Sequence, residues 1–325
     1  MTGAIRIKNC RSYIISFLIL LCSFVPLRGA KKDSPGGVSP SPSKPPTVND
    51  AYPGLTNGAL AYARTSDLPK GTLLRAGTLV IHDKELAEEI AKAPPQMQPE
   101  LKKNALFRLE QIATFRLFLA EAKAQARQSN TDLAEKTDQQ IIEDHLQTLV
   151  KGVDVNDTEI RKFYDSNTQM FGGATLAQIG PQIRQFLLQQ KQQEFVNEHI
   201  RTIGRRMSIE ISAPWLKKHA ILARDNPVDK ARSSGRPSIV DFGSVGCIPC
   251  DMMAPILDKL KAKYKGKVNV LFVHVKEKPI LTGRYGVQAI PVQIFFDKSG
   301  KEVFRHTGFF AEEEIEKQLS KMGVN

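Results

Sequence analysis

Hydrophobic positions divide the chain into an apolar run near the N-terminus, a polar spacer and two folded regions. The apolar run covers residues 13–27, and the Pro-, Ser- and Gly-rich residues 31–71 predict an extended linker. From about residue 72, hydrophobic residues recur with helical spacing. The longest predicted helices run from Pro99 to about Gln128 and from about Pro181 to Arg206.

Shorter elements surround these two helices. Residues 78–81 predict a strand, which is followed by a helix that Asp83 can cap. A further helix is expected over about 132–151, and Asn156–Glu159 is typical of a capping box that opens another. Residues 207–211 predict a second strand that could pair with 78–81. Helices dominate, so we expect an all-α domain over residues 72–212, with a linker over 213–235.

The C-terminal part has a different pattern. Ser238–Gly243 predicts a strand, and after a glycine-containing turn come Cys247 and Cys250, with helical spacing of hydrophobic residues beyond them. Strand patterns follow over 268–275 and in a hairpin over 293–305, and the last helix is expected over about 311–321. This predicts an α/β domain over residues 236–325, and the whole chain is therefore multidomain.

The paired cysteines carry the candidate chemistry. A cysteine at a helix N-terminus lies beside unpaired N–H groups and the positive end of the helix dipole, which favour a thiolate. Cys247 is the candidate nucleophile, and Cys250 lies close enough to close a disulfide. The alternative is a static structural disulfide. No metal site is expected, because there is no second cysteine pair and the histidines lack ligand spacing: His82, His145, His199, His219, His274 and His306.

These motifs together resemble the thioredoxin family over roughly residues 225–325. Residues 285–292 are similar to a family segment in which the proline is cis and lies against the cysteines. The resemblance implies that Ile290, Pro291, Ile248 and Pro249 bind an extended substrate strand, and that Asp241 is a buried acid that exchanges a proton with Cys250. It implies no cofactor. It also places residues 268–275 as the central strand and 227–234 as the first helix, and no first strand is recognisable.

Four positions differ from the family pattern. Gly243 and Gly246 stand where tryptophans are usual, and Phe272 stands where a lysine often pairs with the buried acid. Asp251 follows Cys250 at a position where lysine is common. These differences leave the direction of exchange open between reductase, oxidase and isomerase.

Residues of about 72–212 resemble the N-terminal helical domain of SurA-type periplasmic chaperones and their parvulin prolyl-isomerase relatives. The resemblance is carried by residues 80–86, 156–164 and 183–211. It implies a domain that cradles unfolded polypeptide. No parvulin domain is present, so prolyl isomerase activity is not expected. The alternative is a helical spacer or a dimerisation module.

Charge and the N-terminus bear on location and partners. The net charge of +12 is distributed among interleaved acidic residues without a nucleic-acid-binding motif, so no nucleic-acid partner is expected. Basic residues precede the apolar run 13–27, which is typical of a secretory signal. Residues 1–30 are a cleaved signal, a signal lipidated at Cys22, or a retained membrane anchor. We expect a periplasmic or otherwise exported protein in which Cys247 and Cys250 are the remaining thiols.

The sequence therefore predicts an exported thiol–disulfide oxidoreductase with a helical domain for unfolded clients. Its expected partners are unfolded or disulfide-containing proteins and a membrane or periplasmic thiol electron partner. A competing class is a non-enzymatic chaperone or assembly factor that uses the thioredoxin-like domain for docking. A third hypothesis is a dimeric isomerase in which the helical domain forms the dimer.

Overall fold

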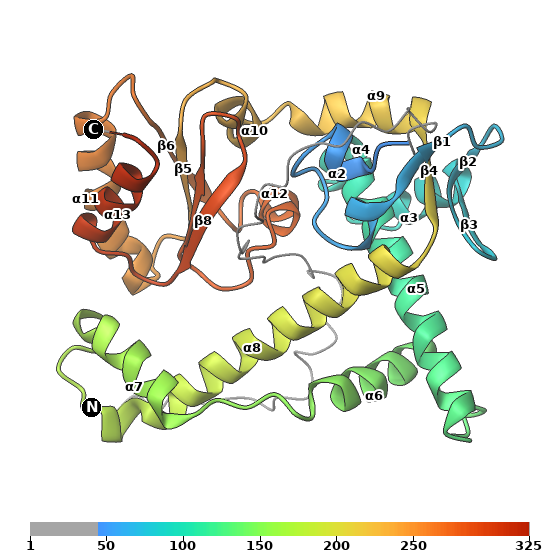
Figure 1. The fold of residues 1–325 in the computed structure, drawn as a ribbon, viewed down its shortest axis with the longest axis horizontal. Helices are drawn as coiled ribbons and strands as arrows, with labels where there is room; N and C mark the ends of the chain where they lie inside the picture. Colours follow the sequence, from blue (N-terminus) through green and yellow to red (C-terminus); the bar gives the residue numbers. More distant parts are fainter. Residues whose placement is uncertain (1–44, 325) are drawn as a thin grey trace, which may run out of the picture.

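The computed structural model describes residues 45–324, which form an N-terminal region, a C-terminal domain and a helical arm that lies beside both (Figure 1). The predicted signal or anchor, including residues 13–27 and Cys22, falls outside the described residues. Among the described helices, none combines the length and the apolar character that a membrane span requires.

The N-terminal region is mainly helical and also contains a small sheet. Its helices are α2 (Val48–Ala51), η2 (Ala59–Tyr62), α3 (Asp83–Ala91), α4 (Gln98–Lys103), α5 (Ala105–Gln128), α6 (Asp138–Val150), α7 (Asp157–Ser166), η3 (Thr168–Phe171), α8 (Leu176–Arg206) and α9 (Ala213–Arg224). Its strands are β1 (Arg64–Ser66), β2 (Thr72–Ala76), β3 (Leu79–His82) and β4 (Ile209–Ser212). The expectation of an all-α domain is therefore wrong, although helices predominate.

The strand pairing of this region differs from the prediction. The described strands form one sheet in the order β1-β4-β2-β3. β4 pairs with β2 and with β1, whereas its expected partner β3 pairs only with β2 in this sheet. The prediction failed because β2 (Thr72–Ala76) carries only two large apolar residues, which are too few to show the alternating pattern by which a strand is recognised.

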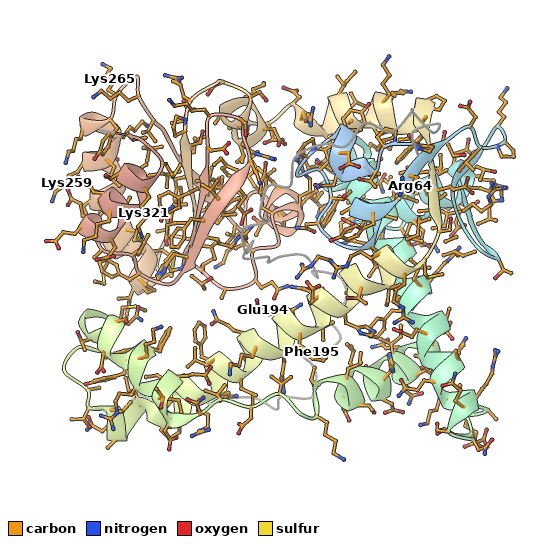
Figure 2. The ribbon with its side chains drawn as sticks, viewed as in Figure 1. Arg64, Glu194, Phe195, Lys259, Lys265 and Lys321 are labelled. Atoms are coloured by element: carbon orange, nitrogen blue, oxygen red, sulfur yellow. A yellow bond between two sulfur atoms is a disulfide. The ribbon has the colours of Figure 1, made fainter. Side chains whose placement is uncertain are left out.

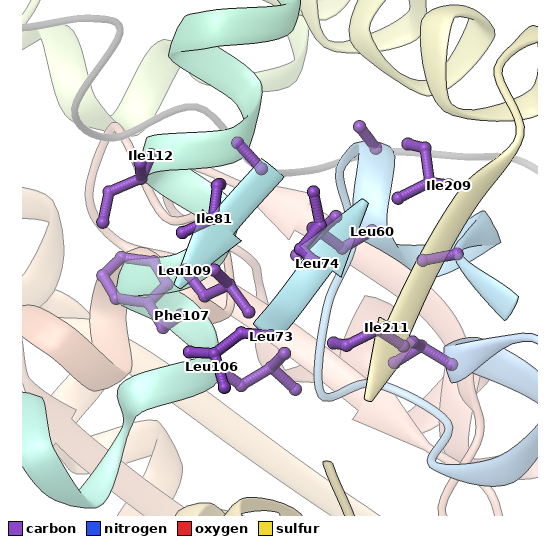
Figure 3. Close-up of a cluster of buried hydrophobic side chains, with 14 of the residues drawn as sticks. Leu60, Leu73, Leu74, Ile81, Leu106, Phe107, Leu109, Ile112, Ile209 and Ile211 are labelled. Carbon is purple, nitrogen blue, oxygen red and sulfur yellow. The ribbon is translucent and has the colours of Figure 1, made fainter. Parts of the chain in front are cut away.

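Within the described residues, folded elements are already present from Val48, well before residue 72. The side chains that show this are at most 1% exposed and belong to the main hydrophobic core: Val48, Leu55 and Leu60. Figure 3 shows Leu60 beside residues of β2, β3, β4 and α5 in this core. The proline-rich composition that predicts a linker thus ends before these residues, and the apolar side chains after it are buried because the sheet and α5 provide a surface for them.

The wide apolar stripe of α5 is core rather than an open groove. Leu106, Leu109, Leu117 and Phe118 are all at most 3% exposed, and Phe115 is the exception at 38%. The predicted helix from Pro99 to Gln128 is interrupted at Asn104, whose side-chain amide donates to the carbonyl of Glu100. That local hydrogen bond competes with helix continuation.

The arm consists of α7 and the N-terminal half of α8 (Figure 1). The predicted capping box is confirmed: the Asn156 side chain accepts from the N–H of Glu159, and the Glu159 carboxylate accepts from the N–H of Asn156. Val155 and Ile160 are buried in one hydrophobic cluster with Ile183 of α8, as the predicted hydrophobic staple requires. By contrast, Asp83 does not cap α3, because His82 occupies the N-cap position.

The C-terminal domain is an α/β unit. Its elements are α10 (Pro227–Arg232), β5 (Ser238–Gly243), α11 (Ile248–Lys263), β6 (Asn269–His274), α12 (Pro279–Arg284), β7 (Val292–Phe296), β8 (Glu302–Thr307) and α13 (Glu312–Lys321). In the described part of the chain its sheet has the order β6-β5-β7-β8, parallel between β5 and β6 and antiparallel elsewhere. The predicted hairpin and final helix are confirmed. β6, expected as the central strand, lies at the sheet edge, because β5 is the only strand of the described chain that pairs with it.

The residues expected to link the two parts, 213–235, contain helices α9 and α10. Arg284 of α12 contacts both helices: it donates to Asp229 of α10, within the C-terminal domain, at 2.5 Å and to the carbonyl of Ala223 in α9 at 2.7 Å. Burial alone would raise the pKa of Asp229, but the charges of Arg284 and Arg232 and the hydrogen bonds from Asn226 and Tyr285 together hold it below its usual range. The buried Arg284 side chain therefore connects the C-terminal domain to the N-terminal region through its hydrogen bond to α9.

Candidate functional site

Cys247 and Cys250 form a disulfide at the start of α11. Cys247 is the N-cap residue of this helix and is partly exposed, whereas Cys250 lies within the first turn and is 4% exposed. Their Cα atoms are 5.2 Å apart, within the usual range for a disulfide. Cys247 is therefore accessible to solvent, whereas Cys250 is not.

Local structure follows from the sequence on either side of the pair. β5 is buried along its whole length and ends at Gly243, and the turn that follows uses Gly246 at φ +79°, a backbone conformation that glycine adopts readily. Pro249 at the second position of α11 needs no N–H there. Because the first turn of a helix has unpaired N–H groups, a reduced Cys247 would lie in a positive local potential that stabilises its thiolate.

Asp241 lies beneath this turn and is completely buried. Burial raises the pKa of Asp241 to about 6, against a smaller opposing effect of the hydrogen bond that Gln293 donates to Asp241 Oδ1 at 2.7 Å. Asp241 Oδ2 has no hydrogen-bond partner among the described residues. Asp241 Oδ2 and Cys250 Cβ both lie 3.4 Å from the point where a Cβ on Gly243 would stand. The structure therefore brings the predicted acid beside the buried cysteine, with one carboxylate oxygen unengaged.

Phe272 occupies the space that Gly243 leaves open. Its Cε2 is 2.9 Å from the Cβ position of Gly243, too close for a side chain there without movement of the ring. Half of Phe272 is exposed. Val245 and Ile248 are exposed more fully, at 79% and 70%. An apolar rim of Val245, Ile248 and Phe272 thus stands near the cysteines, although the tryptophans usual in the resembling family are absent.

The Ile290–Pro291 peptide bond is cis, as the resemblance implies. Val292 pairs with Phe242, so in the antiparallel register Pro291 stands at the end of β7 beside the end of β5, where the cysteine turn begins. Pro291 is buried and Ile290 partly exposed. Of the predicted substrate-binding residues, Ile248 therefore offers most exposed surface.

A cleft of about 580 Å³ opens between the arm and the C-terminal domain. From the arm it is lined by residues of α7 and α8, and from the domain by Gln288, Ala289 and residues of β8. Figure 2 labels Glu194, which lines the cleft, on the side of α8 that faces the C-terminal domain. Because Gln288 and Ala289 directly precede the cis bond, the cleft is continuous in sequence with the predicted substrate-binding segment.

Two parts of this site were not predicted from the sequence. Gln293, the hydrogen-bond donor to Asp241, is a polar residue within the apolar run 292–296, and this was the available signal. The cleft carries no such signal, since its walls come from segments about 100 residues apart in the chain, such as Lys191 on α8 and Gln288.

Comparisons with known proteins concern the C-terminal domain. The family described as thioredoxin-like domain matches residues 225–323. The thioredoxin of Alicyclobacillus acidocaldarius subsp. acidocaldarius is 35% identical over 96 residues, which are 30% of this chain and 90% of that protein. The thioredoxin of Staphylococcus aureus strain Mu50 is 40% identical over 83 residues, 26% of this chain and 79% of that protein. A crystal structure of chloroplastic thioredoxin z is 27% identical, covers 29% of this chain and 84% of that one, and has a TM-score of 0.28.

Proposed function

Because the chain belongs to the thioredoxin family through its C-terminal domain, we propose that it is a thiol–disulfide oxidoreductase of protein clients, with Cys247 as the attacking thiol. The observation that carries this proposal is the disulfide between a partly exposed cysteine at the N-terminus of α11 and a buried one beside Asp241. A purely structural disulfide has no need of a buried carboxyl group beside it.

The reaction begins from the reduced pair. The Cys247 thiolate attacks one sulfur of a client disulfide, the client S–S bond breaks, and the departing client sulfur takes up a proton. This leaves a mixed disulfide between Cys247 and the client. The exposed rim of Val245 and Ile248 would contact the client at this stage.

The second step transfers the remaining bond to the buried cysteine. Asp241, through its unengaged Oδ2, accepts the proton of Cys250, and the resulting thiolate attacks the sulfur of Cys247. The mixed disulfide breaks, the second client thiolate leaves and is protonated, and Cys247–Cys250 is oxidised. The client gains two electrons and two protons. The same steps in reverse oxidise a client.

Client retention is assigned to the cleft between the arm and the C-terminal domain. Its volume of about 580 Å³ lies within the range of ligand sites, and its lining mixes apolar Phe163, Leu187 and Ala289 with charged groups. A polypeptide held there would raise the local concentration of its disulfide near Cys247. This arrangement supports the proposed role of the helical region in binding unfolded polypeptide, which the SurA resemblance implies. Export to the periplasm, through residues 1–30, belongs to the same proposal.

The first experiment is a glutathione redox titration of the full chain carrying Cys10→Ser and Cys22→Ser, so that only Cys247 and Cys250 titrate. A reversible couple near about −270 mV would indicate a reductase that needs an electron donor, and one near about −120 to −180 mV an oxidase or isomerase. A pair that stays oxidised throughout would refute the enzymatic proposal and favour the non-enzymatic chaperone.

A trapping experiment tests the individual roles. In the same background, Cys250→Ser should accumulate mixed disulfides with clients, because the resolving thiol is missing, whereas Cys247→Ser should form none. Two results together would favour the non-enzymatic chaperone with a docking domain. The Cys247→Ser variant would prevent client aggregation to the same extent as the parent chain, and the Cys250→Ser variant would trap no client.

The cleft is tested by photo-crosslinking from neighbouring glutamines of α8. A crosslinker at Gln190, which lines the cleft, should capture an unfolded client, and one at the exposed Gln189, which does not line it, should capture far less. Equal capture from both positions would mean that the cleft does not hold the client.

A further inference from the structure

Two of the histidines, which lack ligand spacing in the sequence, meet in the folded chain. His145 of α6 and His199 of α8 lie beside Glu121 of α5, and one potential ligand atom from each residue falls within 4.8 Å of the others. His199 Nε2 is 2.6 Å from Glu121 Oε2, and His145 Nε2 is 3.7 Å from the same oxygen. The expectation that all six histidines are scattered is therefore wrong for this pair.

His145 is the unusual member of this cluster. Its side chain is 94% buried, and its Nε2 points toward the Glu121 carboxylate but has no hydrogen-bond partner within the described chain. A separation of 3.7 Å is too long for a hydrogen bond. Buried imidazole nitrogens are ordinarily satisfied, so an unpartnered one aimed at a carboxylate and a second imidazole calls for a further group.

The rings are held in place by packing. Phe118 contacts both imidazoles, with ring centroids 4.9 Å from His145 and 5.9 Å from His199. Glu121 and His199 remain partly exposed, at 28% and 20% of their side chains. The cluster thus has one rigid, buried wall and one side open to solvent, through which an ion and a water ligand can enter.

We propose that Glu121, His145 and His199 form a binding site for a divalent transition-metal ion, with Zn²⁺ as the best match and water as the remaining ligand. Two imidazoles and one carboxylate are donors that suit Zn²⁺ and its first-row neighbours rather than Ca²⁺ or Mg²⁺. Ligand atoms around tetrahedral Zn²⁺ stand about 3.3 Å apart, as follows from bonds of about 2.0–2.1 Å. The observed 2.6 and 3.7 Å bracket this value, so small side-chain rotations suffice.

The ion would join three helices at one point. Glu121 is near the C-terminal end of α5, His145 is in α6, and His199 is in the half of α8 that leaves the arm for the N-terminal core. A metal bond among them would fix the direction of α8 and hence the position of the arm. This site is independent of the cysteine chemistry, and its test does not depend on the proposed redox function.

The experiment uses the full chain with Cys10→Ser and Cys22→Ser and with the Cys247–Cys250 disulfide kept oxidised, so that thiolates do not compete. Zn²⁺ binding is measured by calorimetry, and Co²⁺ is added as a spectroscopic probe. We expect one ion per chain, a Co²⁺ spectrum without thiolate charge transfer, and a rise of the melting temperature with Zn²⁺. His145→Gln and His199→Gln, which keep much of the side-chain volume, should each weaken binding by at least about 100-fold, the upper range for loss of a group that only supports a ligand.

The matched control is His82→Gln, at an exposed histidine outside the cluster, which should bind Zn²⁺ like the parent chain. Circular dichroism without metal shows whether each variant folds, and Glu121→Gln, conservative in shape, gives an independent loss of binding. The proposal is overturned if the parent chain binds Zn²⁺ no more tightly than His145→Gln and His199→Gln do, or if Zn²⁺ raises their melting temperatures as much as that of the parent chain.

Discussion

Replacing Asp241 with asparagine should stabilise the C-terminal domain at neutral pH while slowing disulfide exchange. The side chain is completely buried, and burial raises its pKa from 3.8 to about 6. Asparagine has nearly the same shape and can still accept the hydrogen bond from Gln293. It lacks the charge that burial penalises, and it also lacks the carboxylate oxygen that, in the proposed mechanism, accepts the proton of Cys250.

The magnitude follows from the pKa. Each unit of difference between the folded and unfolded pKa corresponds to about 1.4 kcal/mol, so a rise from 3.8 to about 6 costs about 3 kcal/mol once the group is ionised in both states. The folded chain binds this proton more tightly than the unfolded chain, so the free energy of unfolding falls as pH rises through about 4 to 6. The advantage of Asp241→Asn should therefore be near zero at about pH 3.5 and reach about 2–3 kcal/mol above about pH 7.

Hydrogen exchange followed by mass spectrometry is the appropriate assay, because a chain with two folded parts does not unfold in one step. Peptides from β5 and α11 report the opening of the C-terminal domain, after correction for the intrinsic exchange rate at each pH. The measurement is made on the oxidised chain, so that the disulfide is the same in both proteins. Reduction of a small disulfide substrate by the reduced chain is then measured in parallel.

Asp258→Asn is the control, since it removes an exposed carboxylate from α11 and should change stability by less than about 0.5 kcal/mol at any pH. The reasoning is refuted if Asp241→Asn destabilises the domain equally at low and neutral pH, which would mean that the ionised carboxylate is well stabilised. A stabilised variant with unchanged exchange kinetics would instead remove Asp241 from the mechanism.

Three further substitutions probe the packing around the site and along α8. Phe272→Lys places a cation near Asp241, so it should lower the carboxyl pKa by about 1 unit or more and move the pH–rate profile of exchange to lower pH; an unchanged profile would mean that the lysine points into solvent. Gly204→Ala on α8 would bring a Cβ to 2.5 Å from the backbone of η2, so it should destabilise the N-terminal region by about 1–3 kcal/mol, measured by the fluorescence of the single tryptophan, Trp215. Gly180→Ala on the same helix meets only Leu176 Cδ1, at 3.9 Å, and its gain in helix propensity is offset by the following Pro181, so it should change stability by less than about 1 kcal/mol.

Local signals in the sequence determined the C-terminal domain well. The strand before Cys247, the helix after Cys250, the hairpin and the final helix all occur in the structure. These elements depend on side-chain periodicity, glycine at the turn and the helix start, which act over a few residues. The capping box at Asn156 was predictable for the same reason, because its donors and acceptors are three residues apart.

Long-range pairing was not determined in this way. The edge position of β6 depends on whether another strand reaches it, and the pairing of β4 with β2 depends on a strand too short to show a period. Likewise, α5 has the apolar surface that a binding groove or a core can use, and only the packing of the sheet against it decided for the core.

The candidate site also combines features set by local sequence with features set by long-range packing. The sequence by itself indicated Cys247 and Cys250 as the candidate reactive pair and, through the family resemblance, Asp241 as the acid beside them; all three lie within ten residues of one another in a strand–turn–helix unit. Only the tertiary structure placed Gln293 on Asp241, the arm across from Gln288, and His145 and His199 around one carboxylate. Such groups meet because separate elements bury their apolar faces together, and burial depends on the whole core rather than on the spacing of residues along the chain.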